Sequence, residues 1–353
     1  MDGLDGSLSN ADLGELLLAA GASEETSHRR LALERAARAA RFWPEEALDL
    51  VDTGRSLTAL ASVGPWIAAM IHGWIEAPPA VPDIPADRDG YLTLAQVRRV
   101  LAEDPAWETT PHADLQVHST DSDGSVPLEE MAEAARSAGR TFMAATDHSR
   151  SLKIAHGQDE VQLARQGERI DALNARYIEG GEGFRVLRSI EMDVFDDGSG
   201  DMPEDALTAL DLVLGAFHTK LRVPEDATER YLAALRNPTV HVLAHPQARM
   251  YGRRLGLRAD WPRVFDAAAR SGKAVELDAT PYRQDLSVDL ATIANRAGVR
   301  WFSMGSDAHS AGELHNLPFA MATAALAGIP RDRILNYRSA EDVVAWAGEV
   351  AGR

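Results

Sequence analysis

From residue 114 onward, short apolar runs alternate with longer segments that have apolar residues at helical spacing, such as DATERYLAALRN and VDLATIANRAG. Seven such runs occur: DLQV (114–117), FMAAT (142–146), FRVLRSIEMDV (184–194), DLVLGAF (211–217), VHVLAH (240–245), KAVELDAT (273–280) and RWFSMGS (300–306). This alternation predicts an α/β domain with a parallel sheet. The sheet can close into a barrel or stay open and doubly wound, and periodicity alone does not distinguish the two.

The first part of the chain has a different pattern. Residues 10–76 have the spacing of helices, with Asn10 as a candidate N-cap, and the proline-rich stretch APPAVPDIPADRDG follows them. We therefore predict a helical domain over residues 1–76 and a linker with a connecting helix over 77–111. The α/β domain takes residues 112–353.

Composition excludes several classes of protein. A formal net charge of −18 argues against general binding to nucleic acid or to a membrane surface, because either needs a basic face. The chain has no cysteine, so any metal must be held by histidine and carboxylate. No apolar run approaches the roughly 18 residues of a membrane span, and MDGLDGSLSN lacks the character of a secretion signal. We expect a cytoplasmic protein with no membrane partner.

Every predicted strand carries histidine or carboxylate residues at or just after its C-terminal end. In chain order these are His118 and Asp123, Asp147 and His148, Glu191 and Asp193, His218, His245, Asp278, and finally Asp307 and His309. A single residue of this kind often only caps a turn, but turn chemistry does not explain seven strands in succession. The C-terminal ends of parallel strands meet at one edge, where barrel enzymes build their active sites. The pattern therefore predicts a shared site.

Histidines and carboxylates crowded at one edge favour a metal centre. Imidazoles would repel one another if protonated, and so would ionised carboxylates, but divalent cations hold both as ligands. Mixed nitrogen and oxygen ligands suit zinc, manganese or iron, and the number of candidates leaves room for two or three ions. Clustered metals typically hydrolyse phosphate esters, because they lower the pKa of a bound water and neutralise phosphoryl oxygens.

Four motifs carry a resemblance to a known family: DLQVHSTDSDGS, AATDHSRSLKIAHG, VLAHPQARMYGRR and GSDAHS. Over residues 112–350 the chain resembles the PHP (polymerase and histidinol phosphatase) domain, especially the version at the C-terminus of bacterial family X DNA polymerases. The resemblance implies a distorted (β/α)7 barrel and a metal centre, usually trinuclear, that hydrolyses phosphoesters. In those polymerases the domain is a manganese-dependent 3′–5′ exonuclease.

The resemblance also implies a set of ligands. Glu191 should bridge two metals, with His118 and Asp307 on the first and His218 and His245 on the second. The third metal should be held by Asp123, His148 and His309. The family usually begins its first motif with His-x-His, whereas this chain has Gln116 as the first of the pair. Gln116 can offer only a neutral carbonyl oxygen, so one metal position is expected to bind more weakly or to be completed by water.

The helical part resembles, more weakly, the small DNA-binding domain of the same polymerases, with its helix-hairpin-helix. The hairpin there resembles LPGIGKGIA, and here the segment is LASVGPWIA, in which Pro65 removes an amide next to Gly64. Residues 1–80 contain twelve acidic residues and six arginines, a net charge of −6 that disfavours DNA binding. No polymerase palm is recognised, so polymerase activity is not expected.

Two basic groups follow predicted ligands: Arg150 and Lys153 after the second strand, and Arg249, Arg253 and Arg254 after the fifth. They are candidate phosphate-binding residues, since arginine forms bidentate contacts with phosphate, although solvated loops have the same composition. Arg249 or Arg253 would meet charge that develops on the phosphoryl group. His156 is either the proton donor to the leaving oxygen or a plain loop histidine.

These observations predict a metal-dependent phosphoester hydrolase that uses a metal-activated hydroxide. The first hypothesis is action on nucleic-acid 3′ ends, as a 3′–5′ exonuclease or 3′-phosphatase, with a single-stranded DNA 3′ end as the candidate partner. The alternative is a phosphatase for a metabolite such as a nucleotide, a sugar phosphate or histidinol phosphate. A non-catalytic interaction module is the third. Salt-sensitive DNA affinity, tight binding of one small ester, or failure to bind metal would separate them.

Overall fold

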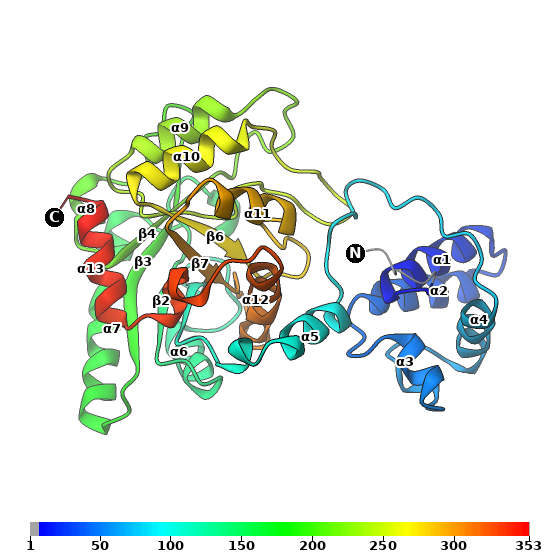
Figure 1. The fold of residues 1–353 in the computed structure, drawn as a ribbon. Coiled ribbons are helices and arrows are strands. Elements are labelled where there is room, and N and C mark those ends of the chain that lie inside the picture. Colours follow the sequence, from blue (N-terminus) through cyan, green and yellow to red (C-terminus); the bar gives the residue numbers. More distant parts are fainter. Residues whose placement is uncertain (1–6, 353) are drawn as a thin grey trace. The chain divides into compact units, whose positions relative to one another are not determined.

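The structure is a computed structural model that describes residues 7–352 of the chain. It divides into two compact units between Asp104 and Pro105 (Figure 1). Each unit has a hydrophobic core of its own. Among residues 7–352, every helix is too short or too polar to span a membrane.

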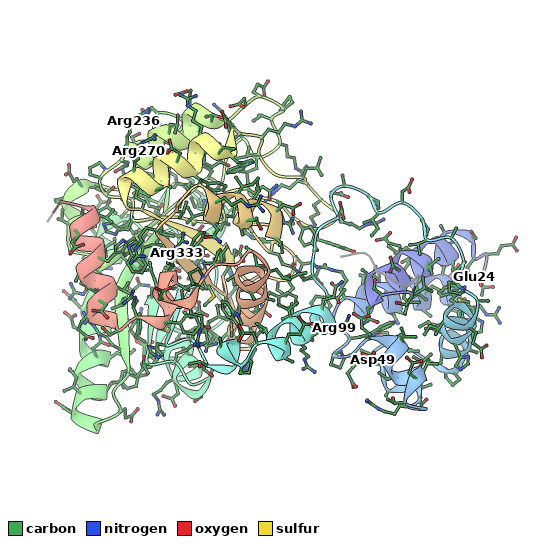
Figure 2. All side chains as sticks on the ribbon, viewed as in Figure 1. Glu24, Asp49, Arg99, Arg236, Arg270 and Arg333 are labelled. Carbon is green, nitrogen blue, oxygen red and sulfur yellow. The ribbon has the colours of Figure 1, made fainter. Side chains whose placement is uncertain are left out.

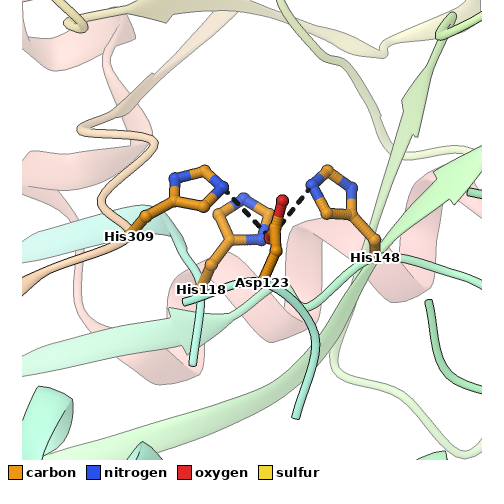
Figure 3. Close-up of side chains that lie close together, drawn as sticks. All are labelled: His118, Asp123, His148 and His309. Carbon is orange, nitrogen blue, oxygen red and sulfur yellow. Dashed lines mark ion pairs between the residues drawn. The ribbon is translucent and has the colours of Figure 1, made fainter. Parts of the chain in front are cut away.

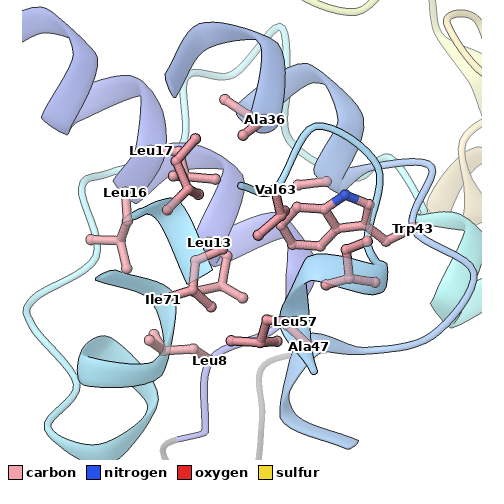
Figure 4. Packing of buried hydrophobic residues seen from close by; sticks show 14 of the residues in the cluster. Leu8, Leu13, Leu16, Leu17, Ala36, Trp43, Ala47, Leu57, Val63 and Ile71 are labelled. Carbon is pink, nitrogen blue, oxygen red and sulfur yellow. The ribbon is translucent and has the colours of Figure 1, made fainter. Parts of the chain in front are cut away.

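The described part of the first unit consists of helices and loops, as the sequence pattern predicts. The helices are α1 (Asn10–Ser23), α2 (Ser27–Ala40), α3 (Ala47–Asp52), η1 (Leu57–Ala59), α4 (Pro65–Glu76) and α5 (Leu94–Glu103). Their apolar faces bury Trp43 completely, with Leu13, Leu17 and Ile71 in the same core (Figure 4). The indole Nε1 of Trp43 donates to the carbonyl of Ala61 at 3.0 Å, which satisfies the one polar atom of this side chain.

The N-terminus of α1 differs from the prediction by one residue. Ser9, not Asn10, is the N-cap: its side chain accepts from the backbone of Asp12, whose carboxylate accepts in return. Asn10 is fully buried and connects α1 to the start of α3. Its Nδ2 donates to the carbonyl of Glu45 at 2.8 Å, and its Oδ1 accepts from Ala47 N at 2.9 Å.

The segment that corresponds to the predicted hairpin is the turn before α4. Ser62 has a φ of 65°, and Gly64 is the N-cap of α4. Pro65 occupies the first helical position, where the missing amide costs no hydrogen bond. Helix α5, predicted as a connecting element, lies within the first unit. Its Arg99, which Figure 2 labels, forms an ion pair with Glu46 at 3.3 Å.

The second unit contains seven parallel strands that pair in chain order. The strands are β1 (Ala113–Val117), β2 (Phe142–Ala145), β3 (Arg185–Asp193), β4 (Leu212–Ala216), β5 (Val242–Leu243), β6 (Ala274–Asp278) and β7 (Trp301–Gly305). Val117 pairs with Ala308 just after β7, and His118 N donates to Ala308 O at 2.9 Å. This contact nearly closes the sheet, so the open wound sheet is excluded and the predicted barrel is confirmed.

The barrel is distorted and is surrounded by helices (Figure 1). The register between β1 and β2 shifts between Asp114 and Val117, and β5 has only two residues. The helices are η2 (Pro105–Glu108), α6 (Leu128–Ser137), η3 (Lys153–Ala155), α7 (Glu160–Gly180), α8 (Glu204–Thr208), α9 (Thr228–Arg236), α10 (Trp261–Ser271), α11 (Val288–Arg296), η4 (Ala311–Asn316), α12 (Leu317–Leu326), η5 (Arg331–Arg333), η6 (Leu335–Tyr337) and α13 (Ala340–Val350). Six strands are buried along their whole length or at all but their first residue, as expected when helices cover a parallel sheet.

Candidate metal centre

Glu191, in β3, is the central residue at the C-terminal edge of the barrel. It is 1% exposed, and imidazole nitrogens from four other strand ends surround its carboxylate. The distances to the nearest oxygen are 3.4 Å for His118 Nε2, 3.1 Å for His148 Nδ1, 3.1 Å for His218 Nε2 and 2.6 Å for His245 Nε2. Burial alone would raise the pKa of Glu191, but the surrounding imidazoles, His148 first, hold that pKa well below its ordinary value.

The first group of candidate ligands consists of His118, Glu191 and Asp307, whose ligand atoms lie within 4.8 Å of one another. His118 Nε2 is 3.1 Å from Asp307 Oδ1. Burial opposes ionisation of Asp307, but Arg283 and His118 hold its pKa well below the ordinary value. Asp307 also has a φ of 50°, a conformation that non-glycine residues adopt mainly where the surrounding structure enforces it.

The second group contacts both carboxylate oxygens of Glu191: His148 Nδ1 is nearest to Oε2, which His118 also faces, whereas His218 Nε2 is nearest to Oε1. His148, Glu191 and His218 form a group within 4.8 Å, and Glu191 Oε1 also contacts His245. His218 Nδ1 lies 2.6 Å from Asp193 Oδ1, so Asp193 orients the imidazole and leaves Nε2 toward Glu191. Sequence reasoning placed Asp193 at this edge and gave it no role. Its position two residues after Glu191, on the same face of β3, was the available signal.

The third group contains His118, Asp123, His148 and His309 (Figure 3). Asp123 Oδ1 is 3.2 Å from His309 Nε2 and 3.6 Å from His148 Nε2. The rings of His118 and His309 stack with centroids 4.3 Å apart. The structure thus brings together all eight histidine and carboxylate residues that the resemblance assigned as ligands. Two details differ from the expected grouping: His118 also joins the third group and His148 also joins the second, while His245 contacts Glu191 Oε1 without belonging to any of the three groups.

Several buried nitrogens in this cluster have no hydrogen-bond partner within residues 7–352. They are His118 Nδ1 and Nε2, His148 Nδ1 and His218 Nε2. Buried polar atoms are normally paired. Three of these nitrogens, His118 Nε2, His148 Nδ1 and His218 Nε2, lie 3.1 to 3.4 Å from an oxygen of Glu191. A neutral imidazole and an ionised carboxylate that face the same point suit a shared divalent cation. The donor set therefore fits zinc, manganese or iron better than magnesium or calcium.

The histidines of the cluster differ in their protonation when no metal is bound. Burial lowers the pKa of His148 to about 3. Burial would also lower the pKa of His218, but Glu191 and Asp193 raise it to about 10. His309 likewise has a pKa of about 10, because Asp123 outweighs the effect of burial. Protons on two histidines thus balance the carboxylates, and metal binding must displace those protons.

Gln116, the residue in place of the family's first histidine, is buried at 0% exposure in β1. With its amide oriented so that both atoms have suitable neighbours, the nitrogen donates to the two oxygens of Glu276 at 2.7 and 3.1 Å. Glu276 also accepts from His245 N at 2.7 Å. Burial and Asp278 raise the pKa of Glu276 well above its ordinary value. The structure thus pairs Gln116 with a buried carboxyl group of β6.

A hydrogen-bond network holds the loop that carries Asp123. Asp147 accepts from Ser119 N at 2.8 Å, Ser119 Oγ at 2.8 Å and Ser122 Oγ at 2.5 Å. Gln166 Nε2, from α7, donates to the same carboxylate at 2.6 Å. Asp147 therefore fixes the loop and does not face the metal groups, a role that the sequence did not distinguish from that of a ligand.

The first predicted basic group lies on exposed parts of the loop after β2. Arg150 forms an ion pair with Glu160 at 3.4 Å, and its side chain is 48% exposed. Lys153 begins η3 and is exposed. His156 ends η3 in the left-handed conformation, with a φ of 56°, and no contact joins it to the metal groups among the described residues. Its predicted role as a proton donor stays a prediction.

The second predicted basic group has more varied surroundings. Arg249 is 6% exposed, and its Nε donates to the carbonyl of Arg283 at 3.0 Å. Arg254 Nε donates to the carbonyl of Ala248 at 2.5 Å, while Arg253 is exposed. Arg283 itself, in the loop after β6, lies 3.4 Å from Asp307, and sequence reasoning missed it. The signal was an arginine five residues after Asp278, at a strand end like the others.

Comparisons with known proteins extend this description. No family model matches the chain. The chain is 38% identical over 234 residues to the "DNA polymerase/3'-5' exonuclease PolX" of Bacillus subtilis, an alignment that covers 66% of this chain and 40% of that protein. It is 32% identical over 192 residues to a "Probable phosphatase" of Acetivibrio thermocellus, and this alignment covers 52% of this chain and 72% of that protein. The chain therefore spans less than half the length of the Bacillus protein.

Among solved structures, a histidinol phosphate phosphatase from Lactococcus lactis matches with a TM-score of 0.43 and 14% sequence identity. That match covers 60% of this chain and 93% of the Lactococcus chain.

Proposed function

Because the chain belongs to the PHP (polymerase and histidinol phosphatase) family of metal-dependent phosphoesterases, we propose that it hydrolyses phosphate esters at the C-terminal edge of its barrel. One observation carries the proposal: buried imidazole nitrogens without hydrogen-bond partners converge on the Glu191 carboxylate. Such an arrangement is hard to maintain without a cation and suits a cluster of them.

Two or three divalent cations, manganese, zinc or iron, would be held by the three groups around Glu191. When bound, the cations would supply an activated water and would neutralise the phosphoryl oxygens. Gln116 would contribute to one position only through its carbonyl oxygen, because its nitrogen donates to Glu276. We therefore expect the metal position next to Gln116 to bind its cation more weakly or to be completed by water.

The remaining roles fall to the chain's own side chains. Asp193 orients His218 through the 2.6 Å contact with Nδ1. Arg249 and Arg253 would meet negative charge on the phosphoryl group, and a bound water or His156 would supply the proton that the leaving oxygen needs. Arg150, Lys153 and Arg254 would bind the rest of the substrate.

For the substrate we propose the 3′ end of a nucleic acid, cleaved by 3′–5′ exonuclease or 3′-phosphatase action. The similarity to the Bacillus polymerase/exonuclease supports this choice, since its 38% identity extends over two thirds of this chain. Cationic side chains in the loops after β2 and β5 suit a phosphate backbone. We expect the helical unit to help present the strand.

The test is a denaturing gel of a 5′-labelled single-stranded oligonucleotide incubated with the protein and manganese. We expect a ladder that shortens from the 3′ end and disappears when a chelator is added. A substrate with a 3′-phosphate separates the two reactions, because a phosphatase removes only the terminal phosphate. An intact band with every substrate would reject action on nucleic acid.

A second candidate is a phosphatase for small metabolites. The relative named "Probable phosphatase" favours it, because this chain spans 72% of that protein. The net charge of −6 over residues 1–80 also disfavours a grip on DNA by the helical part. Release of inorganic phosphate from nucleotide, sugar or histidinol phosphates, with no shortening of the oligonucleotide, would support this candidate. A protein that binds no metal would reject both.

A further inference from the structure

The loop after β6 places one arginine inside the metal-binding edge. Arg283 Nε lies 3.4 Å from Asp307 Oδ2 and 3.7 Å from Asp278 Oδ2, and the side chain is 19% exposed. Asp307 belongs to the first group of candidate ligands. The guanidinium is therefore next to the place where metal and substrate would meet, and part of it remains accessible.

The Arg283 guanidinium has N–H donors that form no hydrogen bond within residues 7–352. Nε is the guanidinium nitrogen nearest to both carboxylates, and within residues 7–352 neither terminal nitrogen forms a hydrogen bond. An arginine carries five N–H donors in a planar fork, and a largely buried one normally satisfies them. Burial opposes its charge, whereas Asp307 and Asp278 raise its pKa, so the group stays cationic. A cation with unused donors at a phosphoesterase site suits an anionic oxygen.

The backbone around Arg283 is fixed from two sides. Its N–H donates to Thr280 O at 2.8 Å, and its carbonyl accepts from Arg249 Nε at 3.0 Å. Asp285, two residues after Arg283, accepts hydrogen bonds from Gln247 N at 3.0 Å and Ala248 N at 2.6 Å. These bonds connect this loop to the loop after β5. Donors held in place before the substrate arrives need no reorganisation during the reaction.

We propose that the two terminal nitrogens of Arg283 bind the non-bridging oxygens of the phosphoryl group that is transferred. This inference rests on the proposed function and adds a substrate-contacting residue that sequence reasoning missed. Arginine matches this role because its fork geometry fits two oxygens of one phosphate. Arg249, whose Nε donates to the carbonyl of Arg283, also holds the backbone at this contact, in addition to the phosphoryl contact proposed for it above.

The alternative is that Arg283 serves only as a counter-ion for Asp307 and Asp278. The two roles are separated by measuring the affinity of the manganese-loaded protein for inorganic phosphate by titration calorimetry, with metal content determined in parallel. The variants are Arg283→Gln and Arg283→Lys. The matched control is Arg270→Gln, which removes an arginine that projects from α10 and is 67% exposed (Figure 2).

We expect Arg283→Gln to weaken phosphate binding at saturating manganese about 10- to 100-fold. Arg283→Lys should lose less phosphate affinity, since lysine keeps the positive charge. Arg270→Gln should bind phosphate with the affinity of the wild type. Phosphate affinity that stays unchanged in Arg283→Gln would overturn the proposal. So would a variant that needs more manganese but, once loaded, binds phosphate as the wild type does.

The binding assay does not depend on turnover, so the two proposals can fail separately. A wild-type protein that binds manganese and phosphate but hydrolyses no ester would contradict the proposed function, while weaker phosphate binding by Arg283→Gln would still identify Arg283 as a phosphate-binding residue. Hydrolysis and phosphate binding that are both equal in wild type and Arg283→Gln would overturn the assignment alone.

Discussion

Individual side chains at the barrel edge share Glu191 as a common neighbour. Each nitrogen within 3.4 Å of its carboxylate comes from a different strand end, so no single element defines the site. Removing one ligand leaves the others buried without a counter-charge, which is costly for any polar group in a low-dielectric site.

Replacing any single ligand should therefore reduce both metal binding and hydrolysis. We expect His245→Ala or Asp307→Ala to lower hydrolysis of a phosphate monoester at least about 100-fold and to reduce the bound metal. Metal analysis of the purified variants, alongside initial rates, is the measurement. Rates and metal content equal to those of the wild type in either variant would remove that residue from the site.

Protonation at the residue scale gives a second prediction. In the metal-free protein the pKa values of His218 and His309 are raised from 6.5 to about 10. A histidine whose pKa is raised in the folded state stabilises it fully below pH 6.5, and this stabilisation is lost as the pH rises toward 10. We expect the free energy of unfolding of the chelated protein to fall by about 1–3 kcal/mol between pH 6.5 and 8.

Urea unfolding at several pH values, with a chelator present, measures this change. The range ends at pH 8 because burial lowers the pKa of Lys273 to about 8. Between pH 8 and 10.5 the contribution of Lys273 to the free energy of unfolding rises and opposes that of the two histidines. Manganese should abolish the decline, since metal binding holds the imidazoles neutral. A chelated protein whose stability is flat or rising from pH 6.5 to 8 would contradict the assignment.

At the scale of elements, the loop after β1 depends on a carboxylate from the loop after β2. Asp147 accepts four hydrogen bonds, three of them from Ser119 and Ser122. We expect Asp147→Asn to loosen this loop, because an amide nitrogen cannot accept, and to weaken manganese binding at the Asp123 group about 10- to 100-fold. Calorimetric titration with manganese measures the change.

The control for that variant is Ser122→Ala, which removes one of the four hydrogen bonds and should have a smaller effect. An affinity for manganese in Asp147→Asn that equals that of the wild type at every site would show that the network does not support the centre.

The elements also show what the sequence could and could not predict. Histidines and carboxylates directly after strands were predictable, because their type and position are local properties. Contacts that depend on the packing of separate strands were not. Gln116 in β1 meets Glu276 in β6 across the intervening strand β7, where a Cβ on Gly305 would come within 2.5 Å of Gln116. No local pattern indicates such a contact. For Arg283 the sequence gives its position after β6 but not that it lies beside Asp307.

Element boundaries were less predictable than element types. The pattern placed α5 in a linker, whereas the structure groups it with the helical unit, where Leu94 N donates to Arg41 O at 2.8 Å. Helix α8, of five residues, was not predicted, since so short a segment carries little periodicity.

At the scale of the whole molecule, the two units have separate cores. The first buries Trp43 among helices, and the second buries the strands of the barrel. Because residues 105–352 contain every candidate ligand, we expect that part to fold alone, to bind manganese as the full chain does and to hydrolyse a small phosphate ester at a rate within about twofold of the full chain.

Circular dichroism, metal titration and initial rates compare the shortened and full chains. Oligonucleotide cleavage, in contrast, should slow if the helical unit presents the strand. An insoluble or metal-free fragment would show that the units depend on each other.

The proposed hydrolysis of phosphate esters depends on a metal cluster around Glu191. It is tested by the rate of phosphate-ester hydrolysis by chelated protein as manganese is added back, for wild type and Glu191→Gln. Glutamine has nearly the same size but cannot supply an anionic ligand. We expect manganese to restore the activity of the wild type and to leave Glu191→Gln at least about 100-fold slower at any metal concentration. Equal recovery of the two proteins would contradict the proposed metal cluster.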